Sequence, residues 1–440
     1  MRALAATCLL LFIALGRPAA LRASDELPGK PQKTPILLEG GTIHPVSGPA
    51  FVGSLLFDKG RITALGKKLE APADAEKIDA AGKHIFPGFF DAYSQLGLTE
   101  INAVRATRDL SESGSINPNV RALVAVNPDS ELIPVTRANG VLLTLTAPSG
   151  GLVSGLASII QLDGWTWEDM ALSSAGGLYI NWPAANPASS WLAGPAAKNP
   201  SANRDRRLQE LRELFDEVRA YGKARASRGD DQPVDARLEA MLPALTGELP
   251  VIARAETIKT IQSAVTFAER QSLRLIIHGG HDAPHCATLL KKHKIPVILR
   301  SVYRLPRRRA EPYDYRFTLP KRLSDAGIPF AISGSPTTRT AHMRNLPYHA
   351  AMAAAFGLSR GQALEAITLA PAKILGVADR VGSLEKGKHA TLFISDGHMF
   401  ETGSNVERAF IQGREVDLSS RHKRLWLKYR EKYRRQREEK

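Results

Sequence analysis

The chain contains very little cysteine. Among its 440 residues there are two, Cys8 and Cys286, and Cys8 lies in an apolar N-terminal stretch that we expect to be removed. A mature chain with one thiol can form neither an internal disulfide nor a cysteine-based metal cluster. A chain of this length can bury a core large enough to do without disulfides, so the shortage is compatible with an exported protein.

Long apolar runs are also scarce. The one clear run, from Ala3 to Leu15, follows Arg2 and precedes small residues, with Leu21-Arg22-Ala23 as a passable cleavage site. It is about a dozen residues long, whereas a bilayer span needs roughly 20. We therefore predict a signal peptide over residues 1–23 and export to the periplasm or the extracellular space. An uncleaved N-terminal anchor is the alternative.

Acidic residues are outnumbered, with 44 Asp and Glu against 59 Lys and Arg and a formal net charge of +15. Much of the excess lies in the last twenty residues, where Leu425, Tyr429 and Tyr433 recur every four positions along one helix face. We predict a basic C-terminal helix over residues 420–440 whose apolar stripe packs on the protein. Contact with an anionic surface is the alternative, and no feature indicates specific nucleic-acid binding.

The rest of the chain has an ordinary globular composition, with 43% hydrophobic and 23% charged residues. Residues 35–86 form short apolar runs broken by turns, and Asp58-Lys59-Gly60 separates two of them as in a β-hairpin. Over residues 87–376 short apolar strands alternate with helices, the pattern of a buried parallel sheet. Residues 377–416 return to short strands. The order predicts an α/β barrel inserted in a small β domain built from both ends of the chain.

Two helices in this region carry explicit start signals. Thr257 precedes a run with apolar residues at helical spacing and is a candidate N-cap. Ser359 and Gln362 have the spacing of a capping box. These signals predict helices that begin directly after Thr257 and Ser359.

Three stretches resemble the amidohydrolase superfamily, in particular its imidazolonepropionase-like and dihydroorotase-like branches. They are GGTIHPVSG through KHIFPGFFDAYSQLGL, GIPFAISGS through LAPAKILG, and VGSLEKGKHATLFI, which together span residues 35–415. The resemblance implies a TIM-type (β/α)8 barrel inserted in a composite β-sandwich. It also implies a hydrolase of non-peptide C–N bonds, such as those of cyclic amides, that uses divalent metal at the C-terminal ends of the strands.

The resemblance also implies a set of metal ligands, and most of them are replaced in this chain. The His-x-His pair after the first strand corresponds to Tyr93 and Gln95, the fifth-strand histidine to Arg254, and the eighth-strand aspartate to Ser335. Only His278, after the sixth strand, matches. A phenol is a poor zinc ligand at neutral pH, and a permanent guanidinium cation repels a metal. We therefore expect a degenerate metal site.

A relocated zinc site is the alternative. The stretch HGGHDAPH, residues 278–285, follows the sixth strand and concentrates possible ligands. Pro284 favours a helix start at that position, which leaves His281 in the loop before it. The candidate ligands of such a site are His278, His281 and Asp282, with His285 as a further one.

The replaced positions outline a pocket at the barrel mouth. We expect Arg254 and Glu256 to form a buried ion pair that fills the space of a metal. The basic run over residues 300–322 follows the seventh strand, is long for a helix-to-strand link, and should overhang the pocket. The predicted pocket residues are Tyr93, Gln95, Arg254, Glu256, His278, His281 and Ser335.

Two functions from different classes follow. One is a hydrolase of C–N bonds with a reduced or relocated metal site. The other is a non-catalytic binding or scaffold protein that takes a small-molecule ligand, with an anionic ligand suggested by the basic run and a homo-oligomer as a further option. Metal-free acid–base catalysis by His278 with Tyr93 is a third hypothesis, because an imidazole and a phenol can exchange protons.

Overall fold

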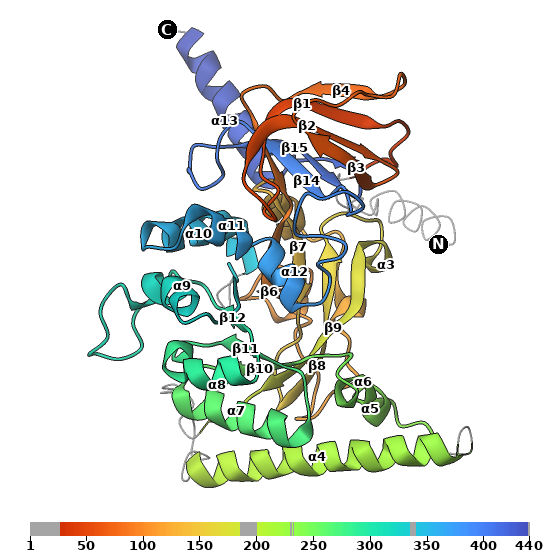
Figure 1. The fold of residues 1–440 in the computed structure, drawn as a ribbon, viewed down its shortest axis with the longest axis vertical. Helices are drawn as coiled ribbons and strands as arrows, with labels where there is room; N and C mark the ends of the chain where they lie inside the picture. Colours follow the sequence, from red (N-terminus) through yellow and green to blue (C-terminus); the bar gives the residue numbers. More distant parts are fainter. Residues whose placement is uncertain (1–26, 185–199, 229–230, 232, 335–339, 439–440) are drawn as a thin grey trace, which may run out of the picture.

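A computed structural model gives the fold (Figure 1). It describes residues 27–184, 200–228, 231, 233–334 and 340–438. The predicted signal peptide, residues 1–23, lies outside this described part. Within it, no helix combines the length and apolar character that a bilayer crossing requires.

Eight strands form one sheet that curls into a nearly closed barrel, which confirms the α/β class. In chain order and in sheet order they are β6 (Phe89–Ser94), β7 (Val141–Thr146), β8 (Val153–Gln161), β9 (Ala171–Asn181), β10 (Val251–Ala255), β11 (Leu275–Gly279), β12 (Val297–Leu299) and β13 (Phe330–Ile332). The first and last strands meet through side chains. Ser333 Oγ donates to the Tyr93 carbonyl at 2.8 Å, and the backbone N–H of Gly334 donates to Asp91 Oδ2 at 3.1 Å.

The barrel departs from a regular (β/α)8 order at one strand. β8 runs antiparallel to both β7 and β9, while the other neighbouring pairs are parallel. Such a strand needs no crossover helix from β7, because an antiparallel neighbour can be reached by a short turn. The expected strands over 140–148 and 157–164 are present, although the strict alternation with helices fails between them.

Helices cover the outside of the barrel (Figure 1). The α-helices are α2 (Leu132–Arg137), α3 (Trp167–Met170), α4 (Pro200–Arg228), α5 (Ala236–Glu239), α6 (Leu242–Leu245), α7 (Ile258–Gln271), α8 (Ala287–Lys292), α9 (Tyr315–Asp325), α10 (Leu346–Ala355), α11 (Arg360–Glu365) and α12 (Leu369–Ile374), and the 3-10 helices are η1 (Arg105–Thr107), η2 (Ala122–Ala125), η5 (Ala283–Cys286) and η6 (Thr340–Asn345). The capping signals are confirmed: Thr257 Oγ1 accepts from the Thr260 N–H and Ser359 Oγ from the Gln362 N–H.

Two layers of apolar side chains hold the barrel together. Ile252 and Ile276 pair in register on β10 and β11, and together with Ile298 on β12 they pack with other buried side chains inside the barrel. The alternate residues of the same strands, such as Val251 and Val297, pack outward against the helices. Because side chains alternate along a strand, the inward position that follows Ile252 is Arg254. The interior therefore becomes polar at its C-terminal end.

The second sheet takes strands from both ends of the chain. They are β1 (Ile36–Ile43), β2 (Phe51–Asp58), β3 (Arg61–Gly66), β4 (Glu76–Asp79), β5 (His84–Pro87), β14 (Leu392–Ser395), β15 (Val406–Ile411) and β16 (Arg414–Val416). All eight are linked by hydrogen bonds, with β1 pairing β4 through its first half and β5 through its second. The predicted hairpin joins β2 to β3, and Lys59 and Gly60 adopt the positive φ angles of 47° and 76° that its tight turn needs.

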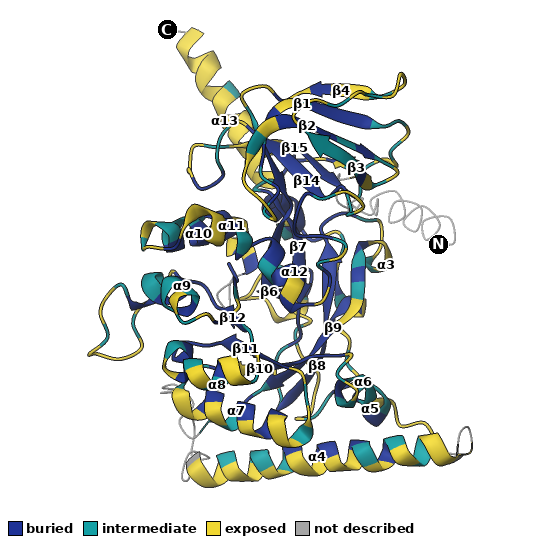
Figure 2. Cartoon of the chain, viewed as in Figure 1, coloured by how far each residue is buried: buried dark blue, intermediate teal, exposed yellow. Residues whose placement is uncertain are grey.

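The basic C-terminal helix forms as α13 (Arg421–Glu438) but does not pack as expected. None of its residues is buried, and in Figure 2 it extends away from the second sheet. Trp426 is 56% exposed and Leu425 is 41% exposed. In the first turn of the helix, Arg424 forms an ion pair with Glu131, which precedes α2, at 3.6 Å. The predicted apolar packing is wrong, because the side chains of the stripe remain exposed.

Candidate functional site

The polar end of the barrel interior brings together two predicted residues and one unexpected residue. The rings of Tyr93 on β6 and His278 on β11 lie 4.0 Å apart between centroids. The Tyr179 hydroxyl, from β9, lies 2.7 Å from Nδ1 of His278. All three side chains are buried, and His278 Nε2 has no hydrogen-bond partner. One imidazole nitrogen is therefore engaged, and the other faces the interior unpaired.

The pKa of His278 and the pKa values of the two tyrosines are shifted in opposite directions. Burial, together with the charges of Arg300 and Arg254, holds the pKa of His278 well below its usual 6.5. Burial raises the pKa of both Tyr93 and Tyr179 above 10. At neutral pH the imidazole and the phenols are all neutral. Because acid–base catalysis works best with a pKa near the operating pH, this arrangement does not favour proton transfer between them.

Arg254 stands directly beside His278. The two residues pair in register on the neighbouring strands β10 and β11, so their side chains project from the same face. Arg254 is exposed, whereas Val251, Ile252 and Ala253 before it are buried, so its guanidinium faces solvent at the barrel mouth. A permanent positive charge therefore occupies the strand position next to the one retained ligand position.

The expected ion pair between Arg254 and Glu256 is wrong. Glu256 pairs instead with Arg300, which follows β12, at 2.8 Å, and with Arg307 at 3.7 Å. Burial would raise the pKa of Glu256, but the neighbouring guanidinium groups hold it below its usual value. The prediction failed because Arg254 is exposed, while Glu256 lies directly beyond β10 and meets the loop after β12.

The residues at the superfamily positions do not fit a metal ion. Gln95 is 7% exposed just beyond β6 and offers only a neutral amide, and Ser335 lies outside the described residues. His278 retains a single free nitrogen, and the charges of Arg254, Arg300 and Arg304 all act on it. A divalent cation there would be held by one neutral donor against several positive charges.

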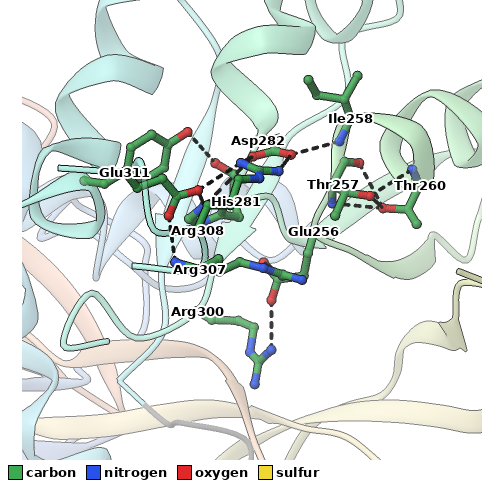
Figure 3. Close-up of polar contacts among 11 residues, drawn as sticks. Glu256, Thr257, Ile258, Thr260, His281, Asp282, Arg300, Arg307, Arg308 and Glu311 are labelled. Carbon is green, nitrogen blue, oxygen red and sulfur yellow. Dashed lines mark hydrogen bonds and ion pairs between the residues drawn. The ribbon is translucent and has the colours of Figure 1, made fainter. Parts of the chain in front are cut away.

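A second cluster lies at the end of β11, where the relocated metal site was expected (Figure 3). His281 and Asp282 are both buried and come together with Glu311 from the loop after β12. His281 Nε2 lies 2.8 Å from Glu311 Oε1. The structure thus groups His281 and Asp282, but it keeps His278 against the tyrosines and leaves His285 exposed.

Arg308 neutralises this second cluster. Its guanidinium donates to both oxygens of Asp282, at 2.9 and 2.5 Å, and to Glu311 Oε1 at 2.9 Å. Burial would raise the pKa of Asp282, but the Arg308 contact holds it below its usual value, and the pKa of Glu311 falls to about 2 despite burial, chiefly through its hydrogen bond from His281. A cation of the chain itself takes the carboxylate oxygens that a metal would need.

The arginines of the basic run over residues 300–322 differ in burial. Arg300 and Arg316 are 6% and 2% exposed, so they are buried under the run they belong to. Burial, with the charges of Arg300 and Arg316, lowers the pKa of Arg304 to about 10. Arg309, in contrast, is exposed. The run is therefore a cap whose arginines partly line the barrel mouth.

Sequence reasoning missed several residues of this site. Tyr179 lies in a strand that was not predicted, and no local pattern links it to a histidine 99 residues away. Arg300, Arg308 and Glu311 lie in the basic run, which was singled out as a segment but not residue by residue. Arg300 follows the buried Ile298 by two positions, and alternation along a strand therefore points both side chains inward. This spacing is the sequence signal that could have identified Arg300.

Comparison with known proteins supports one family. Residues 251–416 match the model of the amidohydrolase family. The amidohydrolase tasK of Hapsidospora irregularis is 25% identical over an alignment of 405 residues that covers 82% of this chain and 40% of that protein. The imidazolonepropionase of Syntrophobacter fumaroxidans is 36% identical over 83 residues, 19% of this chain and 20% of that enzyme. The chain thus spans less than half the length of these relatives.

A solved structure extends the likeness to most of the chain. The amidohydrolase from Thermotoga maritima MSB8 superposes with a TM-score of 0.79 at 28% identity and covers 87% of this chain and 99% of that one. The family match falls on the strands β10 to β13 and the returning strands of the second sheet. The structural match adds the first half of the barrel. The chain therefore belongs to the amidohydrolase superfamily.

Proposed function

We propose that this chain is an amidohydrolase-fold protein whose barrel mouth binds a small molecule and does not perform metal-dependent hydrolysis of C–N bonds. The observation that carries the proposal is the pairing of Arg254 with His278 on adjacent strands. The superfamily's reaction needs several donors that converge on one cation and an acid that accepts a proton from metal-bound water. Here the position beside the one histidine carries a guanidinium.

Further contacts support the same view. Tyr179 engages one nitrogen of His278, and the Tyr93 ring fills the space beside its imidazole. The second cluster, around His281 and Asp282, is already neutralised by Arg308. Both places where a metal was expected are thus filled by side chains of the chain itself, while the barrel that would position a ligand is retained.

Hydrolysis of C–N bonds is the second candidate, and its support is the similarity to proteins named amidohydrolase and imidazolonepropionase. It requires a metal, or another means of activating water, at one of the two places described above. The two candidates differ in metal content, which makes metal content the first measurement.

The test is elemental analysis by mass spectrometry of protein purified without chelators and then dialysed against zinc. We expect less than stoichiometric metal and a melting temperature that zinc does not change. His278→Ala should not alter the metal content, and His285→Ala, at an exposed histidine of the same stretch, is the matched control. Near-stoichiometric metal that His278→Ala removes and His285→Ala retains would overturn the proposal, and so would metal-dependent hydrolysis of cyclic amides, acyl amino acids or dipeptides.

We further propose that the protein is exported. The support is the apolar run behind Arg2 and the small residues that follow it, with a cleavage site near residue 23. Determination of the N-terminus of the protein recovered outside the cytoplasm tests this. Recovery of the uncleaved chain in the cytoplasmic fraction would contradict it.

A further inference from the structure

Positive charge is concentrated at the barrel mouth beyond what the described acids can neutralise. Six arginines take part, three of which act directly on His278, and they face three carboxylates. The arginines are Arg254, Arg300, Arg304, Arg307, Arg308 and Arg316, and the acids are Glu256, Asp282 and Glu311. Arg308 engages two of these acids, Asp282 and Glu311, and Glu256 pairs with Arg300 and Arg307.

Several donors in this region are shielded from water and have no partner. Among the described residues they include Nη1 of Arg304 and Nε of Arg316, and Nε2 of His278 joins them in the tautomer that carries its proton there. Arg316 is 2% exposed and His278 is fully buried. A buried donor that lacks an acceptor costs free energy, and a buried cation without a counter-charge costs more. Such a set is stable in a folded protein when an acceptor enters from outside.

The strand order gathers part of this set at one place. β10, β11 and β12 are consecutive neighbours, and they carry Arg254, His278 and Arg300 at or directly beyond their C-terminal ends. When Tyr179 donates its hydroxyl proton to Nδ1, the neutral imidazole carries its own proton on Nε2. Nε2 is then a donor, and Arg254 occupies the paired position on the neighbouring strand. Guanidinium groups are well suited to oxyanions because their N–H groups match two oxygens at once.

We infer that the barrel mouth binds a small molecule through a phosphate or carboxylate group, held by Arg254, Arg304 and Nε2 of His278. The inference rests on the proposed function, since an anion and a divalent metal ion would compete for the same nitrogen. It adds the chemical class of the ligand. The anion supplies the negative charge that Glu256 alone does not provide.

The test is isothermal titration calorimetry on the full-length protein, dialysed free of anions other than chloride. Inorganic phosphate and succinate are titrated separately at constant ionic strength, so that the stronger binder identifies the group. We expect Arg254→Gln and Arg304→Gln to weaken binding about tenfold each, the effect of one lost charge-assisted hydrogen bond. Arg309→Gln removes the same charge from an exposed position of the same run and should leave binding unchanged.

The outcomes separate this inference from the proposed function. A metal-free protein that binds neither phosphate nor succinate would overturn the inference alone. The inference would also be overturned if Arg254→Gln and Arg304→Gln left binding intact. It would be overturned as well if Arg309→Gln weakened binding equally, because the anion would then respond only to the net charge of the protein. Stoichiometric metal at His278 would overturn the proposed function first. Circular dichroism spectra of the variants establish that they are folded.

A second, independent observation concerns α13. At 100° per residue, four of its five exposed apolar side chains, Leu425, Trp426, Tyr429 and Tyr433, fall within one stripe of about 100°, and Leu427 lies outside it. The helix carries nine Lys and Arg against two Glu, and basic side chains flank the stripe on both sides. Trp426 is 56% exposed, and none of the described residues of the helix is buried.

We propose that α13 docks on an anionic phospholipid surface. Tryptophan and tyrosine are favoured at the level of lipid headgroups, and lysine and arginine beside an apolar stripe reach the lipid phosphates. A groove in a protein partner would need acidic walls on both sides of the stripe, whereas an anionic membrane surface provides this charge everywhere. The attraction should therefore depend on both the apolar stripe and the charge.

Co-sedimentation of the full-length protein with phosphatidylcholine vesicles, with and without phosphatidylglycerol, tests this. We expect binding to the anionic vesicles, loss of most of it in added salt, and loss in the double variant Leu425→Ser with Trp426→Ser. Val52→Ser, at an exposed valine of β2, is the matched control. Equal binding to neutral vesicles, no binding to either, or tight binding to duplex DNA or RNA without vesicle binding would overturn the proposal.

Discussion

The hydroxyl of Tyr179 lies 2.7 Å from Nδ1 of His278, and the two residues come from β9 and β11, strands separated by β10. This contact fixes the imidazole and uses one of its two nitrogens. His278 is the one position that matches the superfamily's ligand pattern, so the contact determines what remains available there. A single buried nitrogen, next to Arg254, is available to a ligand.

Removal of this hydroxyl should change both stability and the imidazole. Tyr179→Phe is expected to lower the free energy of unfolding by about 1 kcal/mol, because a buried ring nitrogen loses its partner. It should also change the tautomer of His278, which nitrogen NMR shifts of a labelled protein report. Tyr303→Phe removes a hydroxyl that donates to the Tyr348 carbonyl at an exposed position and is the control. Unchanged stability and unchanged shifts would refute the role of Tyr179.

The pH dependence of stability should also report on His278. Burial and the charges of Arg300 and Arg254 hold its pKa well below 6.5 in the folded state, so below about pH 6.5 the unfolded chain binds a proton that the folded chain does not. Stability should therefore fall as the pH decreases below this value, by up to about 1.4 kcal/mol per pH unit for this group. Buried His349, with a pKa of about 3, adds a dependence of the same sign.

Urea unfolding of His278→Gln across this range measures the contribution. The slope of the unfolding free energy against pH should decrease by about one proton relative to the native chain. His285→Gln, at an exposed histidine of the same stretch, is the matched control. A slope that His278→Gln does not alter would mean that His278 is protonated in the folded protein.

Arg308 is expected to act as a substitute for a metal ion. Arg308→Ala leaves Asp282 and Glu311 without their shared counter-ion, and it should destabilise the protein by about 2 kcal/mol, a reduced value because Arg308 is half exposed. The freed oxygens and His281 would then form a three-ligand set for zinc. We expect zinc to raise the melting temperature of Arg308→Ala but not of the native chain or of Arg309→Ala. No zinc response in Arg308→Ala would contradict this.

The sequence was sufficient where structure depends on neighbouring residues. The turn at Lys59 and Gly60, the caps at Thr257 and Ser359, and the returning strands near the C-terminus all depend on contacts within a few residues. The position of His278 at the end of its strand followed from the superfamily resemblance, and the structure buries this side chain. Local pattern and the superfamily resemblance therefore predicted the fold class.

The contacts that define the site could not be predicted in the same way. The antiparallel direction of β8 depends on pairing with two strands, and an apolar run alone does not reveal its direction. Asp282 meets Arg308 across 26 residues, and Glu256 meets Arg300 across 44. The pairing of acids with arginines depends on the path of the basic run over residues 300–322 across the barrel. The composition of that run does not specify this path.

Arg304 offers the sharpest distinction between a structural and a ligand-binding role. Burial and the charges of Arg300 and Arg316 lower its pKa to about 10, so its positive charge opposes folding at neutral pH. In anion-free buffer, Arg304→Gln should therefore raise the free energy of unfolding by about 1 kcal/mol.

Phosphate should reduce or reverse this advantage, because a ligand that binds the folded state stabilises the native chain more than a variant that binds it weakly. Urea unfolding of the native chain and of Arg304→Gln, with and without phosphate at equal ionic strength, gives the four free energies of unfolding that are compared. Arg309→Gln is the control and should match the native chain in both buffers. If Arg304→Gln were less stable than the native chain without anions, Arg304 would be a structural residue. A charge that weakens the empty fold and strengthens the occupied one is instead the property expected of a binding site.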